Sequence, residues 1–557
     1  MRRVVDERWT AWEREVWLAH RQYLRVWGER RLAAVLIGAI ALAMSIPALG
    51  SWCIWSPDCF WYLTRARCLA ETGSFPAERL LAPPGLPVLL APLIGLYGEL
   101  PLFSVRVLMA LCWAAVAGMT YLIHRRELGE RWGMLAGVLV AMSTVFANFA
   151  LSPLSEPVFT ALLCGLLIFM ERWHREGPPK YEEAACVGLL AGGAVLIRSM
   201  GIAILPIPVW LILRCGKASA TKRIGRVAVY LACAIGPLLA WELRQRQFVG
   251  GQGYGHVWTE ARSTERTAST GIALQLERLA EFGPKRIDSI KEVLLPKGVF
   301  WRLFNPPFDG LANWLIGGGI VVLAIGRFAK LGAPQDGCLL ATIGILSLWP
   351  YDEGVRLVVP LVPILVAYPL RLAIGLRQVS YGLVWGRRIA TVCVSLLLFA
   401  YAWDMMRWQT RIGVMREKSA ASLRLMAELA AWETAHLPAG AAVLGITPER
   451  SNAKLLLAGA AYLGRHSLRP VDIVRDGAFD VSMGAAECAL VHRSLEGAAR
   501  QRWGLEAVDS ICEFAVFRPA DSPSAALRRA VNDRSIQGLS ARTRIQRSVA
   551  GMPNDDD

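Results

Sequence analysis

Long apolar runs, repeated from residue 32 to residue 403, most constrain how this chain can fold. A helix that crosses the ~30 Å hydrocarbon layer of a bilayer needs about 20 mostly apolar residues. Lipid admits only structures whose backbone groups bond internally, so each run is expected to be a helix. The runs, several of them short, are Leu32–Leu49, Leu102–Ile123, Trp132–Ala150, Pro157–Met170, Val227–Trp241, Leu311–Ile325, Gly337–Trp349, Leu357–Leu370 and Ile389–Trp403. The sequence therefore predicts a mainly α-helical, polytopic membrane protein.

One further stretch, Ala184–Leu213, is too long for one untilted span and carries Arg198 near its middle. Because an arginine at the centre of a bilayer is costly, we divide the stretch into two spans that meet at the outer surface. The run Leu86–Tyr97 is too short to cross, which favours a re-entrant or interfacial segment. The prediction is then about eleven transmembrane helices.

The charge distribution predicts the orientation of these helices. The chain has a net charge of +16, although only 19% of its residues are charged. Lysine and arginine gather in alternate connections, as expected for cytoplasmic loops, so we do not attribute the charge to nucleic-acid binding. These connections are His124–Arg131, Glu171–Glu183, Arg214–Arg226, Arg327–Asp336 and Arg371–Arg388. We expect a multi-pass protein of the cell (inner) membrane, with a cytoplasmic N-terminus and an extracytoplasmic C-terminal region.

Four regions follow from this pattern. They are a cytoplasmic amphipathic segment (1–31), a transmembrane domain (32–403) with extracytoplasmic loops at 51–85 and 244–310, a small extracytoplasmic α/β domain (404–519) and a disordered tail (520–557). The α/β prediction rests on helix and strand patterns at Ser419–His436, Ala442–Ile446, Asn452–Leu463, Cys488–His492 and Ser510–Phe517. Whether Cys488 and Cys512 pair is left open.

The loop at 51–85 holds the most suggestive residues. Asp58 lies at the foot of an aromatic-rich stretch that ends at Gly73 and predicts an amphipathic helix in the headgroup plane. Such a helix would hold Asp58 at the mouth of the bundle. The alternative is structural, because an aspartate after Pro57 is also a good helix N-cap.

Six short motifs occur in an order that resembles the GT-C glycosyltransferases. The similarity is strongest to the branch of bacterial protein O-mannosyltransferases and the lipid A aminoarabinose transferase. The motifs are Asp58 with Tyr62, the pair Pro83–Pro84, Arg106, Leu154–Glu156, Arg198 with Gly201 and Pro206, and Arg356 with Pro360 and Pro363. The chain departs from the family at Cys59, where a second acid often stands, and at Ala82, where a lysine often stands; its nearest base is Arg79.

The resemblance implies a role for each of these polar residues. Asp58 would be the general base, and Arg198 and Arg356 would bind the donor phosphate, with Tyr62, Glu156 and Arg79 in support. Glu156 would orient Arg198 or a metal. Each role has a structural alternative. Glu156 suits the positive end of a helix dipole, and an arginine at the membrane boundary can reach lipid phosphate by snorkelling.

No cofactor is certain from the sequence, and a divalent metal is left open. The candidate ligands are His256 and Glu78, and both are weak. Glu260 follows His256 by four residues, but one His–Glu pair is too little to predict a metal site. The Gly-rich segment around His256 lacks the spacing of a dinucleotide-binding loop.

The predicted function is an inverting transfer of a sugar from a polyprenyl-phosphate carrier to an extracytoplasmic protein, lipid or glycan. One alternative is a transporter or flippase for an envelope lipid, which should show an internal repeat and charged residues at mid-span. Another is a non-catalytic, glycan-binding membrane scaffold, which would tolerate loss of Asp58.

Overall fold

The structure is a computed structural model. It describes residues 28–49, 57–75, 83–97, 102–214, 219–248, 272–295, 311, 314–349, 353–379, 384–436, 442–447, 467–472, 486–492, 506–511 and 514–518. The predicted amphipathic segment before residue 28, residues 249–271 of the second outer loop and the predicted tail at 520–557 lie outside these ranges.

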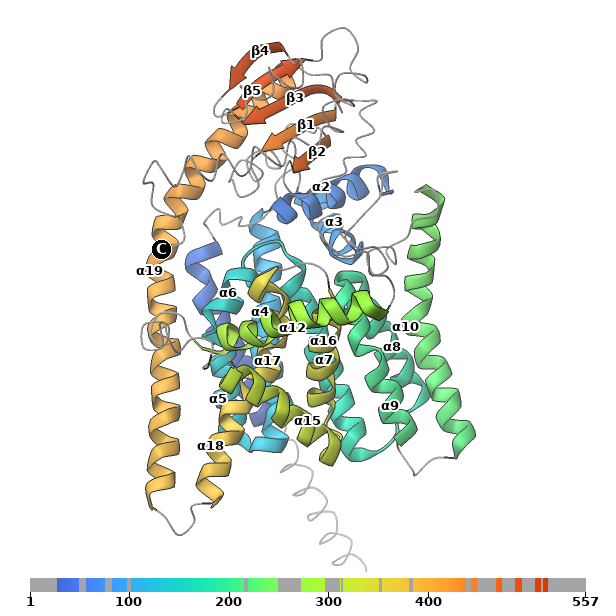
Figure 1. Cartoon of the computed structure of the whole chain (residues 1–557), viewed down its shortest axis with the longest axis vertical. Coiled ribbons are helices and arrows are strands. Elements are labelled where there is room, and N and C mark those ends of the chain that lie inside the picture. Colours follow the sequence, from blue (N-terminus) through green and yellow to red (C-terminus); the bar gives the residue numbers. More distant parts are fainter. Residues whose placement is uncertain are drawn as a thin grey trace, which may run out of the picture.

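The described part of the chain is mainly helical, and its helices form a bundle (Figure 1). The helices are Gly28–Leu49, α2 (Pro57–Thr72), α3 (Gly85–Tyr97), α4 (Leu102–Leu128), α5 (Glu130–Ala141), α6 (Thr144–Ala150), α7 (Ser155–Glu176), α8 (Tyr181–Ile197), α9 (Pro206–Arg214), α10 (Ala220–Phe248), α12 (Ile272–Leu294), α15 (Gly319–Leu331), α16 (Pro334–Leu348), α17 (Val362–Leu365), α18 (Ala367–Val379) and α19 (Val384–His436). Short turns of other helix types lie at Ser199–Ile204, Trp314–Gly318, Gly354–Leu357 and Val359–Leu361.

Six described helices are long and apolar enough to cross a membrane. They are Gly28–Leu49, Phe103–Leu128, Ala220–Gln247, Trp314–Leu331, Val359–Gln378 and Trp385–Ile412. A seventh span results if α5 and α6, which meet at 55°, count as one. The bundle is therefore polytopic, and the full number of about eleven spans stays a prediction.

The long apolar stretch breaks where the sequence predicts. Helix α8 ends at Ile197, Arg198 has an extended backbone (φ −151°, ψ 122°), and a 3₁₀ turn leads into α9. The break removes Arg198 from the middle of a continuous helix. It leaves the guanidinium at the end of the bundle that carries α2 and α3.

Small residues bring the backbones of neighbouring helices close together. On α8, Gly188 and Gly192 face α10, and a Cβ on either would lie 2.5 Å from the Tyr230 carbonyl oxygen or 2.6 Å from that of Ala234. This spacing is the small-xxx-small pattern of membrane helix pairs. At Gly85, an added Cβ would meet the Leu196 backbone at 2.7 Å, so the start of α3 is pressed against the turn that carries Arg198.

Helix α2 lies across one end of the bundle and packs on α3 (Figure 1). Its far end is tied to α10, because Arg244 donates to the Phe75 carbonyl oxygen at 3.1 Å and stacks on Phe75 and Trp241. The helix predicted after Asp58 is confirmed.

Helix α12 lies within the second outer loop and was not predicted from the sequence. It packs on α16, and its Arg286 donates to the Leu346 carbonyl oxygen of α16.

An ionic cluster ties helices together at the opposite end of the bundle. Glu127 of α4 accepts hydrogen bonds from Arg327 at 2.6 Å and from Arg371 at 2.8 and 2.9 Å. Asp336 of α16 accepts from Arg327 and from Tyr368. These bonds join α4, α15, α16 and α18.

The last membrane helix and the helix predicted at Ser419–His436 are one continuous element, α19, of 53 residues. No proline interrupts this segment, so nothing in the sequence forces the helix to stop at the membrane surface. The border predicted between residues 403 and 404 therefore falls inside a helix.

Five strands follow α19: β1 (Ala442–Thr447), β2 (Ser467–Asp472), β3 (Ala486–His492), β4 (Glu506–Ile511) and β5 (Phe514–Arg518). They form one sheet of order β2-β1-β3-β5-β4, in which β1 pairs with its neighbours in parallel and β5 pairs antiparallel. The single strand predicted over Ser510–Phe517 is wrong, because this stretch contains the end of β4 and most of β5, which pair with each other antiparallel. The helix predicted at Asn452–Leu463 lies outside the described residues, so the α/β domain as a whole stays a prediction.

Candidate active site

Helix α2 places Asp58 in its first turn. Pro57 opens the helix, where its missing N–H costs nothing, and the carboxylate lies at the positive end of the helix dipole. Asp58 is the second residue of the helix, whereas an N-cap residue precedes the first helical residue. Asp58 is therefore not the N-cap of α2. Its side chain is 47% exposed, which leaves the carboxylate accessible.

Glu156 lies in the first turn of α7 and is fully buried. Its Oε1 accepts from Nη1 of Arg198 at 2.8 Å and also from Nε of Arg356. Its Oε2 is buried and has no hydrogen-bond partner among the described atoms. A buried carboxylate is expected to be paired in this way, because burying a lone charge is costly. One carboxylate oxygen thus holds two arginines from distant segments.

Arg198 is fixed by three groups besides Glu156. Its Nη1 donates to the Ser155 hydroxyl at 3.1 Å, its Nε contacts the Met200 sulfur at 3.0 Å, and its Nη2 lies 3.8 Å from Glu353. Only 10% of its side chain is exposed. The guanidinium is therefore directed inward, into the cluster.

Arg356 joins Glu156 to Asp58. It lies in the 3₁₀ turn Gly354–Leu357, and its Nη1 donates to Oδ2 of Asp58 while its Nε donates to Glu156. Burial alone would lower the pKa of Arg356, but the fields of Glu156 and Asp58 raise it above its usual value. The side chain therefore stays protonated. In the described part of the chain, no residue hydrogen-bonds its Nη2.

Glu353 belongs to the same cluster, although the sequence reasoning missed it. Its carboxylate lies 3.7 Å from Nη1 of Arg356 and 3.8 Å from Nη2 of Arg198. The sequence feature that could have identified Glu353 is its position three residues before Arg356, about one helical turn away. Opposite charges three residues apart in a helical turn lie on the same face and attract each other, so the spacing predicts that Glu353 lies near Arg356.

Tyr62 lies one turn after Asp58 on α2 and is buried. Its hydroxyl is hydrogen-bonded to Ser155. Burial, together with the negative charge of Glu156, raises the pKa of Tyr62 to about 12. Tyr62 is therefore neutral at physiological pH and can donate a hydrogen bond, but it cannot serve as a general base.

The structure brings together Asp58, Tyr62, Glu156, Arg198 and Arg356, which come from four separate segments. The other predicted residues, Arg79 and the weak metal candidates Glu78 and His256, lie outside the described residues, as does Cys512. Within the described ranges, no group of three His, Cys, Asp or Glu residues is arranged to hold a metal ion.

Comparisons with known proteins show which family and which fold the chain is similar to. The sequence model of the dolichyl-phosphate-mannose-protein mannosyltransferase family matches residues 82–241, which include Glu156 and Arg198. Two solved structures of ArnT from Cupriavidus metallidurans are similar in fold. The one bound to undecaprenyl phosphate has a TM-score of 0.55 at 14% identity and covers 88% of this chain and 98% of that one. The apo form has a TM-score of 0.53 at 14% identity, with coverages of 87% and 97%.

No curated protein matches the chain in sequence. At 14% identity, the likeness to ArnT establishes the fold and not the reaction. The expected resemblance to GT-C proteins is confirmed by two independent comparisons, one of sequence and one of fold. The chain thus has the GT-C fold of ArnT and carries, from residue 82 to residue 241, the sequence pattern of the dolichyl-phosphate-mannose-protein mannosyltransferase family.

Proposed function

We propose that this protein is a membrane glycosyltransferase that moves a sugar from a polyprenyl-phosphate carrier to an extracytoplasmic acceptor. The observation that carries the proposal is the convergence of Asp58, Arg356 and Arg198 on Glu156 at one end of a membrane helix bundle. This reaction needs a base for the acceptor proton and positive groups for the departing phosphate, and an accessible carboxylate beside two fixed guanidiniums supplies both. The undecaprenyl phosphate bound to ArnT supports the choice of donor.

In the proposed reaction, an acceptor oxygen attacks the anomeric carbon of the sugar. Its proton passes to the carboxylate of Asp58, the bond from the anomeric carbon to the phosphate oxygen breaks, and the lipid phosphate leaves with the electron pair. Attack opposite the leaving group inverts the anomeric centre. Asp58 is exposed enough to meet an acceptor that arrives from outside the bundle.

The arginines would hold the phosphate as it gains negative charge. Glu156 fixes both guanidiniums, so their orientation is set before the donor binds, and preorganised donors of this kind stabilise charge that develops in the transition state. The Nη2 of Arg356 would then donate to a phosphate oxygen. The unpaired Oε2 of Glu156 fits a hydroxyl group of the sugar.

The net charge of the cluster implies that further basic residues take part in binding the donor phosphate. Asp58, Glu156 and Glu353 carry three negative charges against two positive ones, so an anionic donor needs additional cations nearby. Helix α2 itself contributes Arg65 and Arg67, both buried. We propose that these arginines, with Arg79, complete the phosphate site, and we leave a divalent metal open.

The sugar is a hexose or pentose unit and the acceptor a protein, lipid or glycan of the envelope. Mass spectrometry of envelope lipids and proteins with and without the gene tests the function. We expect one hexose or pentose mass to be lost with the gene and restored by the wild-type chain, but not by the Asp58→Asn variant. Full restoration by Asp58→Asn would favour the scaffold interpretation, and an unchanged glycan profile with altered lipid sidedness would favour the flippase.

A further inference from the structure

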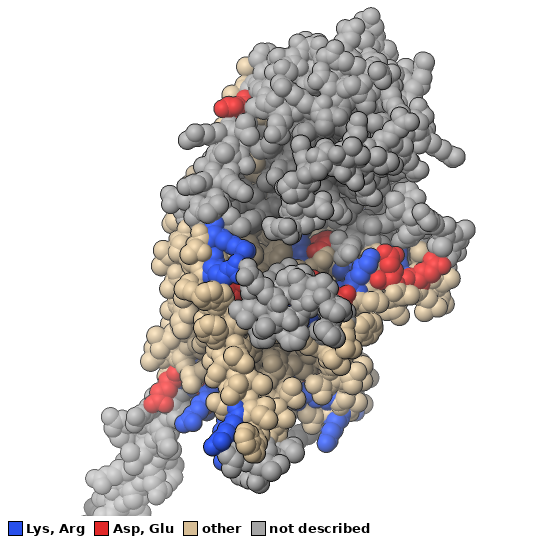
Figure 2. Space-filling view, turned by 60° about the vertical axis from the view of Figure 1, so that its left-hand side comes forward, with Lys and Arg blue, Asp and Glu red and all other residues tan. Residues whose placement is uncertain are grey.

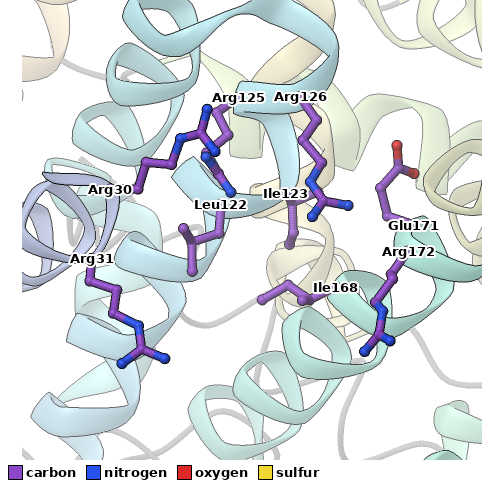
Figure 3. Close-up of a pocket in the computed structure, with 9 residues that line it drawn as sticks. All are labelled: Arg30, Arg31, Leu122, Ile123, Arg125, Arg126, Ile168, Glu171 and Arg172. Atoms are coloured by element: carbon purple, nitrogen blue, oxygen red, sulfur yellow. The ribbon is translucent and has the colours of Figure 1, made fainter. Parts of the chain in front are cut away.

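A cavity of about 190 Å³ opens at the other end of α7, away from the candidate active site (Figure 3). Its floor is apolar and is formed by Leu122 and Ile123 of α4 and Ile168 of α7. Arginines from three helices surround this floor, namely Arg30, Arg31, Arg125, Arg126 and Arg172. The cavity thus combines an apolar surface with a ring of cations.

Nearby carboxylates do not neutralise this ring. Glu130 is shared by Arg30 at 3.1 Å and Arg125 at 3.4 Å. Glu176 is likewise shared, by Arg126 at 3.4 Å and Arg172 at 2.9 Å, and Arg172 also pairs with Glu183 at 3.0 Å. The one acid that lines the cavity, Glu171, already pairs with Arg175 from outside it. Among the described residues, the five arginines of the ring thus pair with three acids, Glu130, Glu176 and Glu183, and positive charge exceeds negative charge around the cavity.

Arg125 provides a second, independent sign of a ligand. Its side chain is only 13% exposed, and its Nε is buried with no hydrogen-bond partner among the described atoms. A buried, unsatisfied donor costs roughly 1–3 kcal/mol, more where the group is charged. Arg125 also lines the cavity, so an anion there would compensate the charge of a guanidinium whose hydrogen bonds are incomplete.

The cavity lies at the level of a lipid headgroup. From Glu156 to Arg172, α7 rises about 24 Å at 1.5 Å per residue, close to the thickness of the hydrocarbon layer. In Figure 2, basic side chains gather at the lower end of the tan body, below a band without charge. Since the first helix begins here and α4 and α7 end here, one headgroup would contact three helices at once.

We propose that this cavity binds the phosphate headgroup of an anionic phospholipid from the leaflet opposite the candidate active site. The guanidiniums bind the phosphate, as expected of arginine, and the apolar floor takes the first part of an acyl chain. Free phosphate has no group to cover that floor, so the site selects a lipid. The bound lipid holds the first helix, α4 and α7 together and takes no part in sugar transfer.

Native mass spectrometry of the full-length protein in detergent tests the proposal, with phosphatidylglycerol and phosphatidylcholine of identical acyl chains as probes. We expect one phosphatidylglycerol to be retained and to be favoured over phosphatidylcholine about tenfold or more. The double variant Arg31→Gln with Arg126→Gln should weaken it roughly thirtyfold, since two cations are lost. Inorganic phosphate at the same concentration should not displace the lipid.

A matched control removes two cations from the same end of the bundle but outside the cavity. Lys222 and Lys330 are both exposed, and the double variant Lys222→Gln with Lys330→Gln should bind phosphatidylglycerol as the wild type does. Ile168→Trp keeps every charge and fills the cavity, so it should also lose the lipid. Equal binding of the two lipids, retention by Ile168→Trp, displacement by inorganic phosphate or equal losses in the two double variants would each overturn the proposal.

Discussion

Arg356 follows Asp58 by 298 residues, yet its guanidinium donates directly to the Asp58 carboxylate. The contact links the proposed base to the proposed phosphate-binding residue. A donor phosphate that binds Arg356 has to share that guanidinium with Asp58. Donor binding would therefore weaken the hydrogen bond from Arg356 to Asp58 just before Asp58 has to accept the proton. We expect the effects of changing Asp58 and Arg356 on turnover to be non-additive.

Replacement of Asp58 by Asn tests the base. The amide keeps the shape of the carboxylate but cannot take a proton, so turnover should fall roughly 10²–10⁴-fold while donor binding survives. Transfer from a polyprenyl-phosphate sugar by the purified protein is the measurement. Glu71→Gln, near the exposed end of the same helix, is the control and should be active. Wild-type turnover by Asp58→Asn would mean that another group takes the proton.

Arg198→Lys and Arg356→Lys test the phosphate site. Lysine keeps the charge but loses the fork that lets one side chain bind Glu156 and a phosphate together. Each variant should lower turnover by about tenfold or more, with normal expression. The control is Arg246→Lys, a 63% exposed position at the end of α10. If both site variants transfer sugar at the wild-type rate, the donor phosphate is held elsewhere, and Arg65, Arg67 and Arg79 are next to be tested.

Glu156 and Glu353 should differ sharply when each is changed to Gln. Glu156 is fully buried between two arginines, and loss of its charge should destabilise the protein by roughly 3–5 kcal/mol. Glu353 is 34% exposed and more distant, so its loss should cost less than about 1 kcal/mol. Thermal unfolding in detergent measures both. Equal losses of stability would show that burial does not set the importance of these acids.

Adjacent glycines on α8 provide a test of helix packing. Gly192→Ala places a Cβ 2.6 Å from the Ala234 carbonyl oxygen, which should separate α8 from α10 and cost about 1–3 kcal/mol. Gly193→Ala points into open space and should be neutral or slightly stabilising. The comparison is made by thermal unfolding. A loss of stability in Gly193→Ala alone would contradict the packing described for this helix pair.

The predicted orientation is tested by cysteine labelling in cells. Glu71→Cys and Lys222→Cys place an exposed thiol at opposite ends of the bundle. A membrane-impermeant maleimide should label Glu71→Cys in intact cells and Lys222→Cys only after permeabilisation, with the wild-type chain as background. The reverse pattern would place the candidate active site in the cytoplasm and exclude an extracytoplasmic acceptor.

Sequence reasoning located the parts of the site that depend on local pattern. The helix after Asp58 follows from its apolar spacing, and the break at Arg198 follows from the cost of a charge in lipid. The link from Glu156 to both arginines was suggested only in part, because it depends on how α7, α8 and the turn at Arg356 meet. Glu353 was missed for the same reason.

The errors also have physical causes. The pattern over Ser510–Phe517 alternates like one strand, and nothing local shows that the chain reverses within it. The continuity of α19 was missed because apolarity ends at the membrane while helix propensity does not. Arg125, Arg126 and Arg172 were recognised as parts of basic connections, and Arg30 and Arg31 as part of the N-terminal segment. Their convergence on one cavity depends on three helices that have an end at the same level.

Helix α19 continues for 33 residues past Trp403, where the apolar run ends, and then leads to the sheet (Figure 1). At 1.5 Å per residue that is about 50 Å of helix. In Figure 1 the sheet lies above α2, the helix that carries Asp58. An acceptor therefore has to approach the candidate site from beneath or beside the sheet, so the sheet would limit which acceptors reach Asp58.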